Sequence, residues 1–69
     1  MSDQRVVGKI GRVTGTVAPG SLGEVMIPIR GGSEAFLART DGKETLPVGA
    51  RIVVLEYLPP RTVLVSQVP

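Results

Sequence analysis

The chain of 69 residues contains no cysteine and no histidine, and these two absences exclude much enzyme chemistry. Without cysteine there is no disulfide or thiolate metal site, and without histidine there is neither the commonest zinc ligand nor an imidazole base. The carboxylates occur singly, with no spacing typical of a glycosidase pair or a calcium loop. We therefore expect no catalytic residue, no cofactor and no metal site, and hence not an enzyme. The six carboxylates are Asp3, Glu24, Glu34, Asp41, Glu44 and Glu56.

Aromatic residues, net charge and long hydrophobic runs are also scarce. Phe36 and Tyr57 are the only aromatic residues, and the formal net charge is +2. The longest aliphatic run is Ile52-Val53-Val54-Leu55, whereas a membrane-spanning helix needs about 18 apolar residues. We expect the chain as given to be soluble, and to reach a membrane only through helices that it does not contain.

Short runs rich in valine and isoleucine, separated by nine glycines and six prolines, indicate β-structure throughout. Within this all-β class, a long first strand that carries glycines and a connection after the third strand favour a barrel. We expect a small five-stranded Greek-key barrel of the oligonucleotide/oligosaccharide-binding (OB) type, with short connections and no long helix. Residues 1–5 are expected to form a disordered lead and residues 6–69 the barrel domain. The expected strands are residues 6–17, 24–30, 33–39, 50–58 and 62–68.

The apolar pattern of the first expected strand slips by one residue. Val6, Gly8 and Ile10 alternate in one phase, and Val13, Gly15 and Val17 in the other. Since side chains along a strand alternate with a period of two, we predict a β-bulge at Gly11-Arg12.

The next two strands are expected to form a hairpin around Gly31-Gly32, because glycine adopts positive φ without strain. That turn pairs Ile27 with Phe36 on the core face and Glu24 with Arg39 at the open end. Pro28 has no N–H to donate, which predicts a bulge or a wider loop there.

The expected strands carry more apolar residues than one barrel interior can hold. The hairpin face opposite Ile27 and Phe36 carries Met26 and Leu37, and the last two strands are apolar on both faces. Part of this surplus is expected on the surface, where an apolar patch indicates a contact site. The alternative is that tight coiling and loops cover it.

The OB-type architecture also permits binding of single-stranded nucleic acid, in which bases stack on aromatic side chains along a basic groove. Phe36 is expected on the core face, which leaves at most one stacking platform, so we rank nucleic acid as an unlikely partner and keep it as the alternative function. The arginines that would supply the charge are Arg30, Arg39, Arg51 and Arg61.

The order of several short motifs resembles the C-terminal soluble domain of the NfeD family. The motifs are Val7-Gly8-Lys9-Ile10-Gly11, Thr16-Val17-Ala18-Pro19, Gly23-Glu24-Val25, Phe36-Leu37-Ala38, residues 46–54 (LPVGARIVV) and Val63-Leu64-Val65. The resemblance implies a five-stranded OB-type barrel attached to membrane helices at the cytoplasmic face. It also implies a role beside stomatin/prohibitin/flotillin-type (SPFH) membrane scaffolds or in membrane protease regulation. Protease activity belongs to a separate domain of longer members, which nothing here matches.

These observations together predict a non-catalytic protein-interaction module. Its partner would be an SPFH-type scaffold, and self-association through edge strands is a further alternative. Apolar side chains would supply the contact and arginines its rim. The predicted partner-binding residues are Met26, Leu37, Tyr57 and Leu58, framed by Arg30, Arg39 and Arg61.

Overall fold

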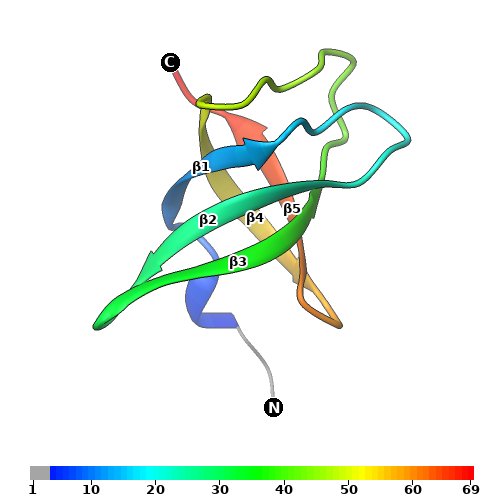
Figure 1. The fold of residues 1–69 in the computed structure, drawn as a ribbon. Helices are drawn as coiled ribbons and strands as arrows, with labels where there is room; N and C mark the ends of the chain where they lie inside the picture. Colours follow the sequence, from blue (N-terminus) through cyan, green and yellow to red (C-terminus); the bar gives the residue numbers. More distant parts are fainter. Residues whose placement is uncertain (1–3) are drawn as a thin grey trace.

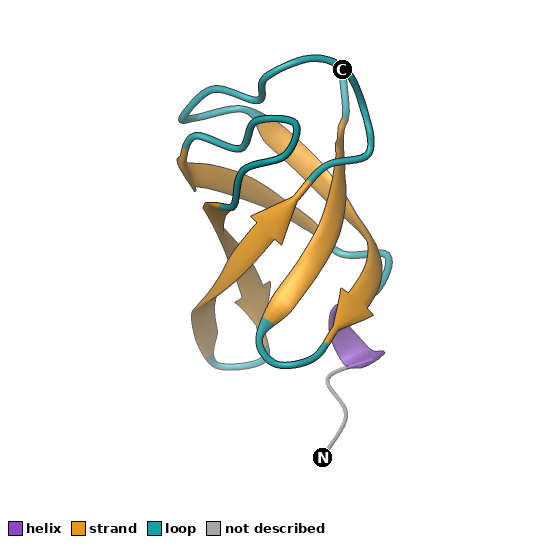
Figure 2. Ribbon diagram, turned by 90° about the vertical axis from the view of Figure 1, so that its right-hand side faces the viewer, coloured by secondary structure: helices purple, strands orange, loops and turns teal. Residues whose placement is uncertain are grey.

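A computed structural model describes residues 4–69. A short 3₁₀ helix, η1 (Gln4–Val6), precedes five strands that close into a barrel in the order β1-β2-β3-β5-β4 (Figures 1 and 2). The pair β3–β5 is parallel and the other four pairs are antiparallel. The predicted small five-stranded barrel without a long helix is confirmed. The strands are β1 (Ile10–Gly15), β2 (Gly23–Ile29), β3 (Gly32–Arg39), β4 (Arg51–Leu58) and β5 (Thr62–Gln67).

The barrel interior is filled by aliphatic side chains and the two aromatic rings. The rings of Phe36 and Tyr57 meet edge to face, with centroids 6.5 Å apart. This geometry places the positive edge of one ring against the negative face of the other. Among the described residues no polar or charged side chain is buried, so apolar packing carries the fold. The core residues are Val6, Val13, Val17, Val25, Ile27, Phe36, Ala38, Leu46, Ile52, Val54, Tyr57, Val63 and Val65.

The bulge predicted at Gly11-Arg12 is wrong. Gly11 and Val13 both face the interior, and Ile10 points outward with 40% of its surface exposed. The irregularity in the β1–β2 register lies between Val13 and Gly15 instead. The apparent slip arose because Val6 reaches the core from η1, before the strand begins, so its burial does not follow the period of β1.

The hairpin forms, but its register differs from the predicted one by two residues. Ile29 pairs with Gly32, so the two-residue loop is Arg30-Gly31, with Gly31 at φ 84°. Since a shift of two keeps every side chain on its face, Ile27 and Phe36 still both point inward. The predicted Glu24–Arg39 pair is replaced by Glu24 opposite Leu37.

Pro28 causes no bulge, because its nitrogen points away from β3. The Leu37 amide donates to Arg61 in the chain leading into β5, so the pair Glu24–Leu37 exchanges no hydrogen bonds. Pairs with and without hydrogen bonds alternate along an antiparallel ladder. Pro28–Ser33, four residues along β2 from Glu24–Leu37, is therefore also a pair without hydrogen bonds. The missing N–H of Pro28 therefore removes no bond between β2 and β3.

The apolar residues on both faces of β4 are explained by its pairing with β5. The register between β4 and β5 shifts between Val54 and Glu56, which inverts the phase of the strand. Val54 on one side of the shift and Tyr57 on the other therefore both face the core, and Leu55 is left 50% exposed. No helix within residues 4–69 has the length and hydropathy to cross a membrane.

Candidate interaction surface

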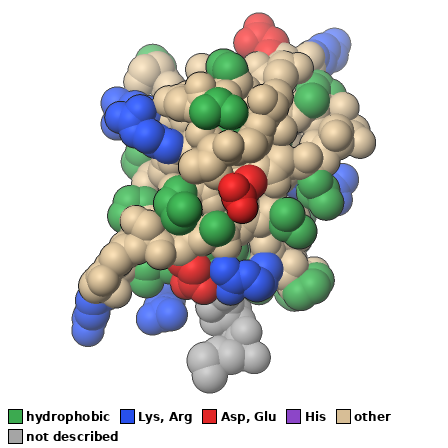
Figure 3. Space-filling view, in the orientation of Figure 1, with side chains coloured by type: hydrophobic (Ala, Val, Ile, Leu, Met, Phe, Trp, Pro, Cys, Tyr) green, Lys and Arg blue, Asp and Glu red, His purple; other side chains and the backbone are tan. Residues whose placement is uncertain are grey.

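The outer side of the barrel carries an apolar surface over β1, β2 and β3. Its exposed members are Ile10 on β1, Met26 on β2 and Leu37 on β3, which are 40%, 37% and 46% exposed. Pro28, also exposed, lies two residues from Met26 on β2 and so faces the same way. In Figure 3 the hydrophobic side chains over β2 and β3 form several small groups with acidic and basic groups between them. We call this region the outer apolar face.

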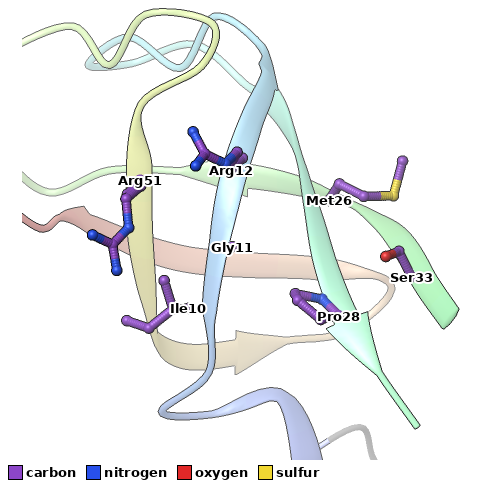
Figure 4. A pocket seen from close by; sticks show the side chains of 7 residues that line it. All are labelled: Ile10, Gly11, Arg12, Met26, Pro28, Ser33 and Arg51. Carbon is purple, nitrogen blue, oxygen red and sulfur yellow. The ribbon is translucent and has the colours of Figure 1, made fainter. Parts of the chain in front are cut away.

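A shallow groove of about 260 Å³ crosses this face. Figure 4 shows its lining, with two arginines on one side and Met26, Pro28 and Ser33 on the other. Gly11 forms part of the floor, and it must be glycine because a Cβ there would lie 2.5 Å from the carbonyl oxygen of Met26. β1 can therefore run close to β2 beneath the groove. The lining residues are Ile10, Gly11, Arg12, Met26, Pro28, Ser33 and Arg51.

The two predicted partner-binding leucines lie in one row across three strands. Leu58 pairs with Thr62, and Thr62 pairs with Leu37. Leu37 is well exposed, whereas Leu58 is half-buried. The row lies beside Met26, since Leu37 faces Glu24, two residues along β2. Met26, Leu37 and Leu58 therefore all lie on the outer side of the barrel, on β2, β3 and β4.

Tyr57 does not belong to this surface, and its predicted exposure is wrong. The β4 bulge turns it inward, leaving 8% of its surface exposed. Its hydroxyl oxygen accepts a hydrogen bond of 3.0 Å from the backbone N–H of Arg61. Tyr57 packs in the core and holds the β4–β5 turn with its polar end.

Arg61 is held by the barrel itself. Its guanidinium forms an ion pair of 2.8 Å with Glu34, donates to the carbonyl oxygen of Ala35 at 2.6 Å, and lies 5.0 Å from the centre of the Phe36 ring. A guanidinium at that distance from an aromatic ring is attracted to its negative face. Arg61 therefore ties the turn after β4 onto β3, and its charge faces Glu34 of its own chain.

Arg30 and Arg39 do not frame one patch. Arg30 lies in the β2–β3 loop, beside Arg5 and Lys9. Arg39 ends β3 and lies beside Ser21 and Leu22. Seven residue steps separate the ends of β3, which is about 23 Å at about 3.3 Å per residue.

The predicted partner-binding residues did not include Ile10, Arg12 or Arg51, and Arg51 was named only for the nucleic-acid alternative. All three are exposed and line the groove. An uninterrupted period of two through β1 would have placed Ile10 and Arg12 on the outer side together. The pairing of Arg12 with Arg51 depends on the β1–β4 register, which no local pattern specifies.

The surface offers no aromatic stacking platform. Phe36 and Tyr57 are the only aromatic residues of the chain, and both are buried. Binding of single-stranded nucleic acid by base stacking therefore lacks its usual groups. Among the described residues no group of three or more acidic side chains is placed to hold a metal ion.

A closed five-stranded barrel with β1-β2-β3-β5-β4 order defines the class of this protein as an OB-like domain. The family profile described as the NfeD C-terminal domain matches residues 10–66, and the chain belongs to this family. The resemblance noted in the sequence is thus confirmed. A comparison with curated protein sequences finds no match.

Two solved structures are similar in fold. One is the soluble domain of the NfeD protein YuaF from Bacillus subtilis, with a TM-score of 0.82, 22% identity, and coverage of 94% of this chain and 76% of that one. The other is the C-terminal domain of stomatin operon partner protein 1510-C from Pyrococcus horikoshii, with a TM-score of 0.75 and 25% identity. That comparison covers 100% of this chain and 97% of the other.

Proposed function

We propose that this domain is a non-catalytic protein-interaction module that binds an SPFH-type, stomatin-like membrane scaffold through the outer apolar face. In this proposal it is the soluble part of a membrane-anchored protein and lies at the cytoplasmic face. The similar Pyrococcus horikoshii domain belongs to a protein described as a stomatin operon partner, which supports this class of partner.

The observation that carries the proposal is the exposure of Ile10, Met26 and Leu37 on a barrel whose core is already full. Thirteen apolar residues of the described chain are buried in the interior, so these three are not needed to complete it. Each costs the isolated domain free energy in water, at about 25 cal/mol per Å² of apolar surface. A partner that covers them recovers that free energy, as at other protein interfaces.

The barrel topology also bears on self-association. Each strand pairs with two neighbours, but β5 covers β3 only at Leu37–Arg39, so residues 32–36 of β3 have no strand partner on that side. A homo-oligomer of this domain would use either this short edge or the outer apolar face.

The test is a pull-down from detergent-solubilised membranes of the source cell, with the tagged domain as bait and with or without nuclease. We expect mass spectrometry to identify an SPFH-type scaffold in both cases. Capture that disappears with nuclease, or capture without any SPFH-type protein, would overturn the proposal in favour of nucleic acid or another partner.

A matched pair of variants locates the contact. Leu37→Asp places a charge on the outer apolar face, and Leu55→Asp places one on β4, where the side chain has nearly equal exposure, 46% against 50%. Both variants should fold, as measured by circular dichroism and thermal melting. We expect Leu37→Asp to lose the scaffold and Leu55→Asp to keep it. The reverse result would place the contact beside Leu55, next to the Thr40–Glu44 segment.

A further inference from the structure

Two arginines lie directly opposite each other on neighbouring strands. Arg12 of β1 pairs with Arg51 of β4, and both side chains are exposed on the outer side of the barrel. The carbonyl of Arg51 accepts a hydrogen bond from Val68, so its backbone polar groups point away from β1. Arg12–Arg51 is therefore a pair without hydrogen bonds between its members, the type in which side chains approach most closely.

This arrangement costs the free domain stability, because like charges directly opposite each other on a sheet repel. Arg12 donates to the carbonyl oxygen of Gly49 at 3.2 Å, which orients its guanidinium. Within residues 4–69 no carboxylate forms an ion pair with either arginine, and no hydrogen bond uses the Arg51 side chain. The pair thus places two cationic side chains on adjacent strands at one groove, and no carboxylate of the described residues is paired with either.

The pair borders the groove of the outer apolar face. Met26 pairs with Arg12 on its other side, and Ile10 lies two residues before Arg12 on β1. Ile10, Met26 and Pro28 therefore line the same groove as the two arginines (Figure 4). Glu24 accepts a hydrogen bond from Thr14 and Glu34 pairs with Arg61, so the nearest acids on β2 and β3 are engaged elsewhere.

We propose that this groove recognises a short acidic–apolar segment of a partner polypeptide, in which an aspartate or glutamate precedes or follows an aliphatic side chain. The carboxylate lies between Arg12 and Arg51, and the aliphatic side chain lies against Ile10, Met26 and Pro28. Guanidinium groups suit this role because they are weakly hydrated and bind carboxylates through two parallel hydrogen bonds. The inference rests on the proposed function and names the chemistry of the partner segment.

The arrangement of the site suits a peptide segment. The groove is shallow, with a volume of about 260 Å³, and has both charged and apolar lining residues. Its cations stand on one side only, which suits a ligand whose charge and apolar group are adjacent. A membrane surface would instead be met by a broad basic rim around protruding apolar groups.

The experiment selects a library of random peptides displayed on phage against the folded domain. We expect the selected peptides to carry an acidic residue within two positions of an aliphatic one. Affinity of a selected synthetic peptide is then measured by titration, with NMR amide shifts to locate it. The double variant Arg12→Gln, Arg51→Gln should bind about tenfold more weakly or worse, whereas the matched variant Arg39→Gln should bind as the original domain does.

Thermal melting separates this binding role from a structural one. Because the arginines repel each other, the double glutamine variant should be at least as stable as the original domain while it loses the peptide. Selection of basic or purely apolar peptides, or equal affinity of the double variant, would overturn the inference. So would stronger binding to vesicles of phosphatidylcholine and phosphatidylserine, with amide shifts at the same groove.

The double variant also separates this inference from the proposed function. Suppose that the double variant still captures the SPFH-type scaffold from membranes while Leu37→Asp does not. The proposed function then stands, and recognition of an acidic segment by Arg12 and Arg51 is refuted. If no variant captures a scaffold but the peptide binding follows the two arginines, the groove chemistry holds and the proposed partner class fails.

Discussion

Replacing Arg61 by alanine tests how the β4–β5 turn is held on the barrel. The change removes the ion pair with Glu34, the hydrogen bond to the carbonyl oxygen of Ala35, and the contact with the Phe36 ring. It leaves the bonds made by the backbone of residue 61, which are those to the Tyr57 hydroxyl and from the Leu37 amide. The loss is therefore confined to the side chain.

The loss of folding free energy in Arg61→Ala can be estimated from the exposure of the groups involved. The side chains of Arg61 and Glu34 are 53% and 44% exposed, so their ion pair contributes about 0.2–1 kcal/mol. The guanidinium over the buried ring adds about 0.5–1 kcal/mol. Because these terms share one side chain they do not simply add, and we expect a total loss of about 1–2 kcal/mol. For a domain of this size that lowers the Tm by about 5–15 °C.

The backbone at position 61 supplies a second, independent signature. Arg61 is the one described residue other than glycine with positive φ, at 52°. A left-handed conformation costs an L-residue about 1–2 kcal/mol that glycine avoids. Arg61→Gly should therefore be about 1 kcal/mol more stable than Arg61→Ala, although both lack the guanidinium.

Urea unfolding followed by circular dichroism measures all three changes, with Glu34→Gln as the variant that removes only the ion pair. We expect Glu34→Gln to lose less than Arg61→Ala, because the ring contact and the bond to Ala35 remain. The reasoning is refuted if Arg61→Ala is as stable as the original domain, or if it is more stable than Arg61→Gly.

Further predictions concern the glycines, the core and the arginine pair. Gly23→Ala should cost about 1–3 kcal/mol of stability, because the new Cβ would meet the carbonyl oxygens of Gly15 and Thr16. A Cβ added at Gly32 would meet nothing within 4 Å. Gly32→Ala should therefore be neutral or stabilising by about 0.4–1 kcal/mol; equal losses at both sites in urea unfolding would contradict this. Phe36→Ala should cost about 3–5 kcal/mol and leave little folded domain at 37 °C, seen as loss of amide dispersion in NMR. Arg51→Gln should raise the Tm at low salt and less so at high salt, and a salt-independent change would argue against repulsion.

The fold could be predicted from the sequence because local signals and global topology agree. Runs of valine and isoleucine bounded by glycine and proline gave the bounds of the last two strands to within one residue. The hairpin was expected from Gly31-Gly32, and it forms one residue earlier, at Arg30-Gly31. Register is set by which backbone conformations the loop adopts, and two adjacent glycines permit more than one.

The errors about which side chains face inward share one cause, the position of bulges. A bulge inverts which residues face inward, so misplacing it exchanges core and surface for part of a strand. The bulge wrongly expected at Gly11-Arg12 placed Ile10 inside, and the missed shift after Val54 placed Tyr57 outside. The hairpin contains no bulge, and there the predicted exposure of Met26 and Leu37 is confirmed.

The barrel can carry an exposed apolar face because closure removes the usual hazard of such a surface. An open sheet with apolar residues at its edge would pair with other chains, since its edge presents free N–H and C=O groups. Here every strand has a partner on both sides, although β5 covers only Leu37–Arg39 of β3, so few backbone groups are open to another chain. The Arg12–Arg51 pair adds a charge that a second copy of the same face would repel, since two copies would bring four arginines together. Apolar side chains beside uncompensated cations therefore favour a different, acidic partner over self-association.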